Sequence, residues 1–135
     1  PTIVGVEPSR AACMLASIEA GQPVQIPGPH ESIMAGLNCG EPSMIAWPIV
    51  SAGTDAFVAV DDERAREGMR LLARDGITAG ETGAAGLAGL LDLLDGSEPG
   101  RMRSLISADE HATVLLIVTE GATDPEAYAR IVAPG

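Results

Sequence analysis

The sequence predicts an α/β fold, a three-layer structure in which helices cover both faces of a mainly parallel sheet. Short apolar runs rich in β-branched residues alternate with helical segments along the chain, which is typical of parallel strands joined by crossover helices. Residues 113–118 form a continuous apolar run, as expected for a strand buried on both faces. With 135 residues and 46% apolar content, the chain is long enough to bury a core.

The first elements are expected to be a strand and a helix. Residues 2–6 are apolar and partly β-branched, which favours a short strand. Ser9 is a suitable cap for a helix over Arg10–Ala20, and Gly21 is suited to end it.

Two further helices are expected between residues 32 and 50. Ser32 is a candidate cap for a brief helix that ends near Leu37. Pro42 suits the first position of a helix running to about Val50, because the missing N–H of proline is not needed there. Pro48 is expected to kink this second helix.

A second strand and a strongly amphipathic helix follow. Residues 55–60 alternate in polarity and predict a strand, and Asp61 is placed to cap a helix over residues 62–74. Asp75-Gly76 is expected to stop that helix. Ile77-Thr78 predicts a very short strand.

The remaining elements lie around a long apolar run. A helix is expected from about Thr82 to Leu94, with a further turn of helix within residues 97–107. Residues 113–118 predict the clearest strand of the chain. A last short helix is expected to open at Asp124-Pro125.

The composition excludes several classes of partner. The formal net charge is −11, and the eight basic residues, all of them arginine, form no basic stripe, so neither nucleic acid nor an anionic membrane is an expected partner. No apolar run reaches the roughly 20 residues that a membrane span needs. We therefore expect a soluble, cytoplasmic protein.

The cysteines, histidines and acidic residues predict neither a metal site nor a catalytic one. Cys13 and Cys39 lack metal-site spacing; two isolated buried thiols are expected, with a disulfide between them as the alternative. His30 and His111 lie in expected loops without a nearby nucleophile or carboxylate pair, which favours solvated side chains. The acidic residues 61–63 mark a helix start, and no metal is expected there.

Two turns are candidates for one ligand site. Ligands bind outside the carboxyl ends of parallel strands, where residues 80–83 (GETG) and 119–121 (TEG) are both expected. The glycines allow the backbone to approach a flat ligand or a neighbouring helix closely. Thr119 could contact the ring nitrogen of a heteroaromatic cofactor or only cap its turn. Glu81, on the first turn of a helix, could accept a hydrogen bond from a ligand or only cap the helix.

Four segments carry a family resemblance. In chain order they are Ile3–Pro8 (IVGVEP), Ile33–Pro42 (IMAGLNCGEP) with Trp47 after it, Gly80–Ala84 (GETGA) and Thr119–Pro125 (TEGATDP). Together they resemble the diaminopropionate ammonia-lyases, fold-type II enzymes that use pyridoxal phosphate. The match spans nearly the whole chain, and its second and fourth segments separate this group from threonine dehydratases and cysteine synthases.

The resemblance implies a fold, a reaction and a cofactor. The chain would belong to the large domain of a fold-type II enzyme that uses pyridoxal 5′-phosphate. That enzyme would be a homodimer that converts 2,3-diaminopropionate, a small amino-acid substrate, to pyruvate and ammonia by β-elimination and deamination in amino-acid catabolism. Thr119 matches the hydroxyl residue that meets the pyridine nitrogen, and Thr82 is the second candidate. Glu81 would lie near the cofactor ring or its 3′-oxygen, with Gly80 in the same turn.

The resemblance also implies that residues 1–135 are a single partial domain. Such an enzyme needs a Schiff-base lysine, a glycine-rich loop for the phosphate and an acidic base for the α-carbon, and the chain has no lysine at all. We therefore expect the C-terminal part of the large domain, with the N-terminal catalytic part and all catalytic residues absent and no activity alone. The alternatives are a freestanding α/β binding or regulatory domain, and another fold-type II amino-acid lyase or dehydratase.

Overall fold

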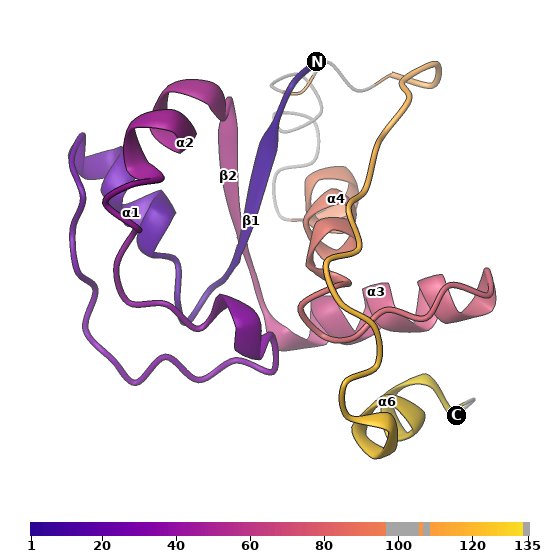
Figure 1. Cartoon of the computed structure of the whole chain (residues 1–135). Coiled ribbons are helices and arrows are strands. Elements are labelled where there is room, and N and C mark those ends of the chain that lie inside the picture. The colour runs from indigo at the N-terminus through magenta and orange to yellow at the C-terminus, as the bar shows by residue number, and fades with distance from the viewer. Residues whose placement is uncertain (97–105, 107–108, 134–135) are drawn as a thin grey trace. The chain divides into compact units, whose positions relative to one another are not determined.

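The computed structural model describes residues 1–96, 106 and 109–133. The chain forms two compact units, Pro1–Asp62 and Glu63–Gly135, which are called the N-terminal and the C-terminal unit below (Figure 1). No helix in the described part of the chain is long and apolar enough to cross a membrane.

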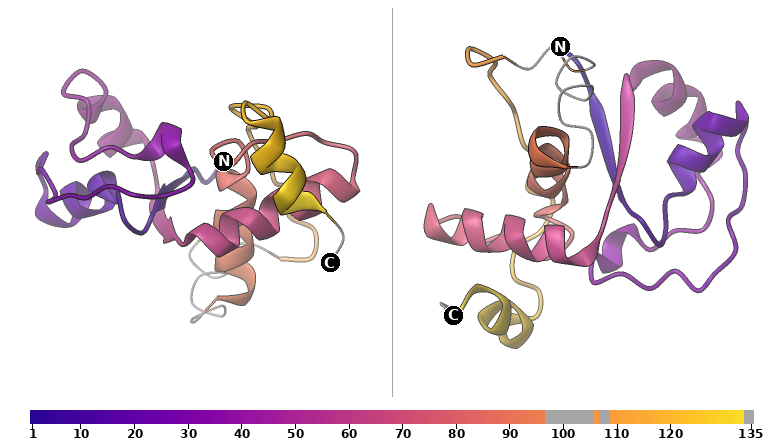
Figure 2. Two further views of the ribbon diagram at one scale, coloured as in Figure 1. Left: turned by 90° about the horizontal axis from the view of Figure 1, so that it is seen from below. Right: turned by 180° about the vertical axis from the view of Figure 1, so that it is seen from behind.

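The N-terminal unit contains a pair of parallel strands, as the alternating pattern predicts. Strand β1 (Val4–Pro8) pairs with β2 (Ala56–Val60) in a register that sets Val4 opposite Ala56 and Pro8 opposite Val60. The two strands run side by side when the unit is seen from behind (Figure 2). Helix α1 (Cys13–Ala20) contacts β2, so the fold class is confirmed as α/β with a parallel sheet.

The parallel pair depends on a glycine that leaves room for an aromatic ring. Gly5 of β1 stands opposite Phe57 of β2, and a Cβ atom at Gly5 would lie 2.4 Å from Cε1 of the Phe57 ring. The ring therefore occupies the space that any larger residue at position 5 would need. On β2, Val58 and Val60 are buried in the core.

Helix α1 begins three residues later than predicted, and Ser9 does not cap it. The N–H of Ser9 donates to the carbonyl of Val60 at 2.8 Å, so this backbone continues the strand pairing. The carboxylate of Glu7 caps the helix instead, because it accepts the N–H groups of Met14 and Leu15, each at 2.9 Å. Gly21 ends the helix in the left-handed conformation, as predicted (φ 69°).

The two cysteines do not form a disulfide. Cys13 is buried and Cys39 is exposed, and both are free. The expectation of isolated thiols is confirmed, but the expectation that both are buried is wrong for Cys39. Burial, followed by the charge of Glu7, raises the pKa of the Cys13 thiol to about 11.

The loop between α1 and α2 is held by side-chain hydrogen bonds around Ser32. The Ser32 hydroxyl donates to Oδ1 of Asp62 at 2.6 Å and accepts the N–H of Met34 at 3.1 Å. Asn38 accepts the N–H of Ser32 and donates to its carbonyl. The short 3-10 helix η1 (Ala35–Leu37) ends at the predicted Leu37, but Met34 is its N-cap and no side chain caps it, so the prediction of Ser32 as its cap is wrong. Met34 is fully buried.

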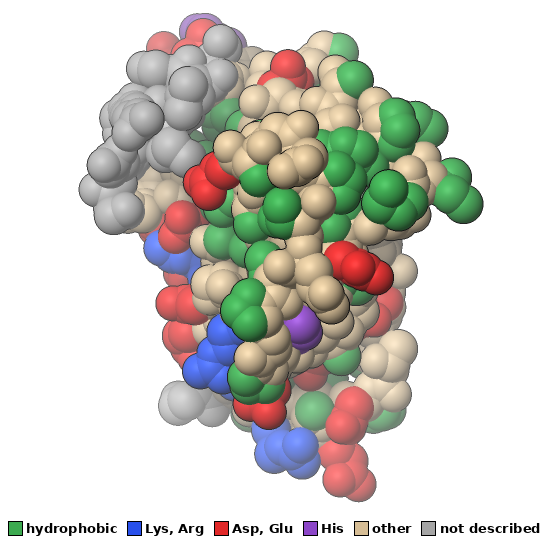
Figure 3. Space-filling view, turned by 90° about the vertical axis from the view of Figure 1, so that its left-hand side faces the viewer, with side chains coloured by type: hydrophobic (Ala, Val, Ile, Leu, Met, Phe, Trp, Pro, Cys, Tyr) green, Lys and Arg blue, Asp and Glu red, His purple; other side chains and the backbone are tan. Residues whose placement is uncertain are grey.

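Helix α2 (Trp47–Gly53) begins five residues after the predicted start, and Pro48 lies in its first turn. Pro48 therefore opens this helix rather than kinking it, because the first turn needs no donor from that residue, and Pro42 is buried in the preceding loop. Apolar side chains around the start of α2 face outward, and Ile45 is 89% exposed. Hydrophobic side chains gather on the face of the molecule that carries α1 and α2 (Figure 3).

The C-terminal unit is built from three described helices. They are α3 (Asp62–Arg74, whose first residue belongs to the N-terminal unit), α4 (Ala85–Asp95) and α6 (Pro125–Val132). Met69, Leu72, Ala79 and Ala84 form its core, and apolar residues of α6 such as Tyr128 pack against them.

Three predicted helix boundaries in the C-terminal unit are confirmed. Helix α3 spans the predicted residues 62–74, and Gly76 follows it with a φ of 76°. Asp124 caps α6 by accepting the N–H groups of Glu126 and Ala127.

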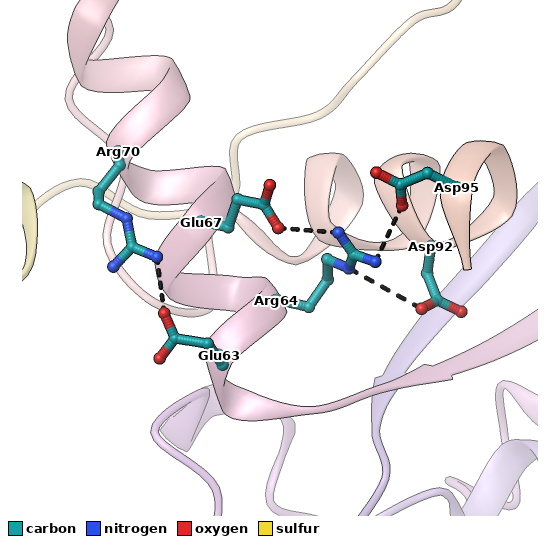
Figure 4. Close-up of polar contacts among 6 residues, drawn as sticks. All are labelled: Glu63, Arg64, Glu67, Arg70, Asp92 and Asp95. Atoms are coloured by element: carbon teal, nitrogen blue, oxygen red, sulfur yellow. Dashed lines mark hydrogen bonds and ion pairs between the residues drawn. The ribbon is translucent and has the colours of Figure 1, made fainter. Parts of the chain in front are cut away.

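Helices α3 and α4 are joined by charge as well as by packing. Arg64 of α3 lies within ion-pair distance of Asp92 and Asp95 of α4, at 3.8 and 2.9 Å, and of Glu67 at 2.8 Å (Figure 4). Arg70 instead bonds to Glu63 of its own helix, which lowers the pKa of the Glu63 carboxyl. Exposed ion pairs contribute little singly, but Arg64 contacts two carboxylates of α4 at once and so links the two helices.

The clearest predicted strand, residues 113–118, is not a strand in the described structure. Its side chains are largely exposed, with Leu115 at 85% and Ile117 at 71%. A strand exists only through hydrogen bonds to a neighbour, and the sheet of the described residues contains β1 and β2 alone. Residues 77–78 are also not a strand, for the same reason. The helical turn predicted within residues 97–107 falls outside the described residues except for residue 106.

Replacing Gly5 by alanine is expected to lower the free energy of unfolding by about 1–3 kcal/mol, the usual cost of overpacking. The new methyl group would overlap the Phe57 ring, and urea denaturation of the purified chain measures the effect. Gly53→Ala is the control, because a Cβ atom there meets nothing within 4 Å. Equal losses in the two variants would contradict the packing argument.

Candidate functional site

The two glycine-containing turns that the sequence places at one edge do meet in the C-terminal unit. The N–H of Gly80 donates to the carbonyl of Glu120 at 3.2 Å. The N–H of Thr82 donates to Oε1 of the Glu120 side chain at 3.1 Å. Residues 80–83 and 119–121 therefore form one structure, which we call the paired turns.

The glycines of the paired turns make room for protein backbone. A Cβ atom at Gly80 would lie 2.3 Å from the carbonyl oxygen of Gly121, and one at Gly83 would lie 2.3 Å from that of Glu120. Of the two occupants that the sequence leaves open, the described structure supports a packed chain segment rather than a flat ligand. These glycines fix where residues 119–121 lie.

Glu81 and Thr82 lie in a turn before α4 rather than on its first turn. The helix begins at Ala85 instead of Thr82. In the turn before it, the N–H of Ala85 donates to the carbonyl of Thr82, three residues back, in place of the four-residue spacing of an α-helix. Both side chains are half-buried. Helix α4 has no acidic residue in its first turn and no side-chain cap, so of the two alternatives for Glu81 the structure does not support helix capping.

Thr119 has an exposed side chain at the end of the extended apolar run. Within the described residues its hydroxyl makes no hydrogen bond, so the structure gives no support to a role in capping the turn. The next residue, Glu120, is bonded to the paired turn through both its carbonyl and its carboxylate. The backbone that carries Thr119 is therefore held in place while its hydroxyl stays accessible.

The two histidines differ in their surroundings. His111 is exposed, as predicted, and faces Glu110 at 3.6 Å. His30 is half-buried rather than solvated, because its ring packs on Gly40 and Nε2 lies 3.2 Å from the carbonyl of Ile26. No cluster of metal-ligating side chains occurs among residues 1–96, 106 and 109–133.

Sequence reasoning missed the role of Glu120. The sequence places it in a turn but gives no sign that its carboxylate reaches a residue 38 positions away. No local signal identifies it, because the N–H group that it accepts belongs to a turn that Glu120 meets only in the folded chain. The structure thus adds one residue to the site.

The fold and the paired turns define a recognisable class of protein. The sequence profile described as "Pyridoxal-phosphate dependent enzyme" matches residues 1–120. The chain belongs to this family of pyridoxal-phosphate dependent enzymes, whose cofactor is pyridoxal phosphate, as the resemblance predicts.

Within the family, the chain is similar to the diaminopropionate ammonia-lyases. It is 41% identical to the enzyme of Salmonella typhimurium over 143 residues, which cover 100% of this chain and 35% of the relative. The Escherichia coli enzyme, solved with an aminoacrylate-PLP azomethine reaction intermediate, matches with a TM-score of 0.82 and 33% identity over 98% of this chain and 34% of that one. Maize serine racemase matches with a TM-score of 0.78 and 25% identity over 96% and 38% of the two chains. This chain spans about a third of the length of the curated relatives it matches.

The donor set at the paired turns fits the ring nitrogen of pyridoxal phosphate. A threonine hydroxyl both donates and accepts, and that of Thr119 is exposed on a backbone held at the next residue. The chain has no lysine, so a Schiff base to a lysine side chain cannot form on these residues.

Gly83→Ala is expected to disrupt the paired turns, because its methyl group would overlap the backbone carbonyl of Glu120. We expect a loss of about 1–3 kcal/mol in the free energy of unfolding, measured by denaturant titration. Gly86→Ala on the same segment is the matched control, since its nearest neighbour is a leucine methyl at 3.8 Å. A loss at position 86 as large as that at position 83 would refute this account.

Proposed function

We propose that this chain works as the C-terminal part of a pyridoxal-phosphate dependent lyase that eliminates ammonia from 2,3-diaminopropionate and yields pyruvate. The observation that carries the proposal is the 41% identity to a diaminopropionate ammonia-lyase over the whole chain. The paired turns support it, because they hold the backbone next to Thr119 while the Thr119 hydroxyl stays exposed. We also propose that the full-length enzyme is a cytoplasmic homodimer, as the resemblance implies.

In this proposal Thr119 contacts the cofactor. When bound, pyridoxal phosphate supplies an electron sink for negative charge at the substrate α-carbon. The Thr119 hydroxyl would orient the ring through its nitrogen, and because a hydroxyl is neutral it would leave that nitrogen largely unprotonated. Such a nitrogen moderates charge withdrawal, which suits elimination over transamination.

The other three candidate residues belong to the same paired turns. Glu81 would lie near the ring or its 3′-oxygen, and Thr82 is the second candidate for a hydroxyl contact. Gly80 would contribute through the close approach it allows to Gly121. The side chains of Glu81 and Thr82 are half-buried in the turn that also receives Glu120.

A second candidate is another amino-acid enzyme of the same fold. It is favoured by the match to maize serine racemase and by one to a threonine deaminase with a TM-score of 0.64 and 29% identity. A freestanding binding or regulatory domain is the remaining candidate, because residues 1–135 contain no lysine for a Schiff base.

The decisive experiment is a substrate assay of the full-length protein loaded with pyridoxal phosphate. We expect pyruvate and ammonia from 2,3-diaminopropionate at a higher kcat/KM than from serine or threonine. Residues 1–135 alone should form no product, because they contain no lysine. A preference for serine or threonine would transfer support to the second candidate, and no turnover of any of the three would support the binding domain.

Thr119→Asp in the full-length protein is expected to shift the absorption spectrum of the bound cofactor and to increase transamination relative to elimination. The added carboxylate would hold a proton at the ring nitrogen by opposite charge. Thr123→Asp adds the same charge at an exposed position in the neighbouring turn and should leave both quantities unchanged. Unchanged partitioning in the Thr119 variant would contradict the assigned contact.

A further inference from the structure

Glu120 makes two different hydrogen bonds to one short turn. Its carbonyl accepts the N–H of Gly80 at 3.2 Å, and its carboxylate Oε1 accepts the N–H of Thr82 at 3.1 Å. The backbone and the side chain of Glu120 therefore each bind the turn at residues 80–82. A residue held in this way has little freedom to rotate, and the peptide that links it to Thr119 is held with it.

The carboxylate of Glu120 is suited to this place by charge. The bonded N–H groups precede α4, an eleven-residue helix without a side-chain cap or an acidic residue in its first turn. Free N–H groups and the helix dipole make such an end favourable for a negative charge. Glu120 supplies that charge from a distant part of the sequence.

Little free space surrounds Glu120. A Cβ atom at Gly80 would lie 2.8 Å from Oε1 of Glu120, and one at Gly83 would lie 2.3 Å from its carbonyl oxygen. Gly80 thus lies against the half-buried Glu120 side chain, and Gly83 lies against the Glu120 backbone. A shorter or apolar side chain would remove the hydrogen bond between the Thr82 N–H and Oε1 of Glu120 and would leave the Glu120 backbone held through its carbonyl alone.

We propose that Glu120 is a positioning residue that sets the Thr119 hydroxyl against the cofactor ring by clamping the backbone to the turn at residues 80–82. This inference rests on the proposed function, in which Thr119 contacts the ring nitrogen. Glu120 itself does not touch the cofactor in this scheme. Its effect passes through Thr119.

A double-mutant cycle in the full-length protein tests the inference. The dissociation constant of pyridoxal 5′-phosphate and the absorption spectrum of the bound cofactor are measured for Thr119→Ala, Glu120→Ala and the double variant. Each single variant should bind the cofactor about 3- to 10-fold more weakly, the usual worth of one hydrogen bond. The double variant should match Thr119→Ala within twofold, because Glu120 has no effect once the hydroxyl is gone.

Glu126→Ala is the matched control. Glu126 is an exposed glutamate on α6 of the same unit, so the variant makes the same change in charge without touching the paired turns. Its cofactor affinity and spectrum should remain those of the parent protein. A loss equal to that of Glu120→Ala would show a general effect of charge and overturn the inference.

The cycle separates the two hypotheses. Unchanged binding in Thr119→Ala would overturn the ring contact and with it the proposed role of Thr119. Weaker binding in Thr119→Ala together with unchanged binding in Glu120→Ala, or losses that multiply in the double variant, would overturn only the positioning role.

A second pair of variants serves if Glu120→Ala does not fold. Glu120→Gln keeps a side-chain oxygen at the same reach and should preserve cofactor affinity, whereas Glu120→Asp withdraws it by one methylene and should weaken binding. Equal affinity in these two variants would overturn the inference.

Discussion

The contact between residues 80–83 and 119–121 is the constraint on which the candidate site depends. Two hydrogen bonds that Glu120 accepts and the absence of side chains at Gly80 and Gly83 bring two backbone segments closer than larger residues at positions 80 and 83 would permit. This contact places the exposed Thr119 hydroxyl beside the turn that carries Glu81 and Thr82. The residues proposed to face the cofactor are therefore near one another because of backbone packing, not because of direct contacts between their side chains.

A similar use of acidic side chains supports the rest of each unit. In the N-terminal unit, the buried carboxylate of Glu7 accepts two N–H groups at the start of α1, which satisfies a charge that would otherwise be costly to bury. In the C-terminal unit, Asp92 and Asp95 of α4 hold Arg64 of α3. Much of the acidity that the composition shows thus has specific structural partners.

Much of the fold was predicted from local sequence pattern. The wrong predictions concern hydrogen bonds between residues that are distant in the sequence. The parallel strands, the full span of α3 and the cap of α6 by Asp124 follow from periodicity and from residues close in sequence. Ser9 failed as a cap because its N–H pairs with Val60. Residues 113–118 have the composition of a buried strand, yet no described strand pairs with them. The sequence predicted that the two glycine turns lie together, although the strands at 77–78 and 113–118 on which that prediction rested are not strands in the described structure. It did not predict the hydrogen bonds to Glu120.

The sequence by itself determined the family, the parallel α/β class and the absence of a lysine among these residues, because these depend on residue identity and on short-range periodicity. Only the tertiary structure decided what fills the space beside Gly80 and Gly83, which carboxylate caps α1, and where Thr119 is anchored. The physical reason is that hydrogen-bond donors and excluded volume act between residues that meet only in the folded chain. Glu120, for example, accepts the N–H of Thr82, which is 38 positions away in the sequence.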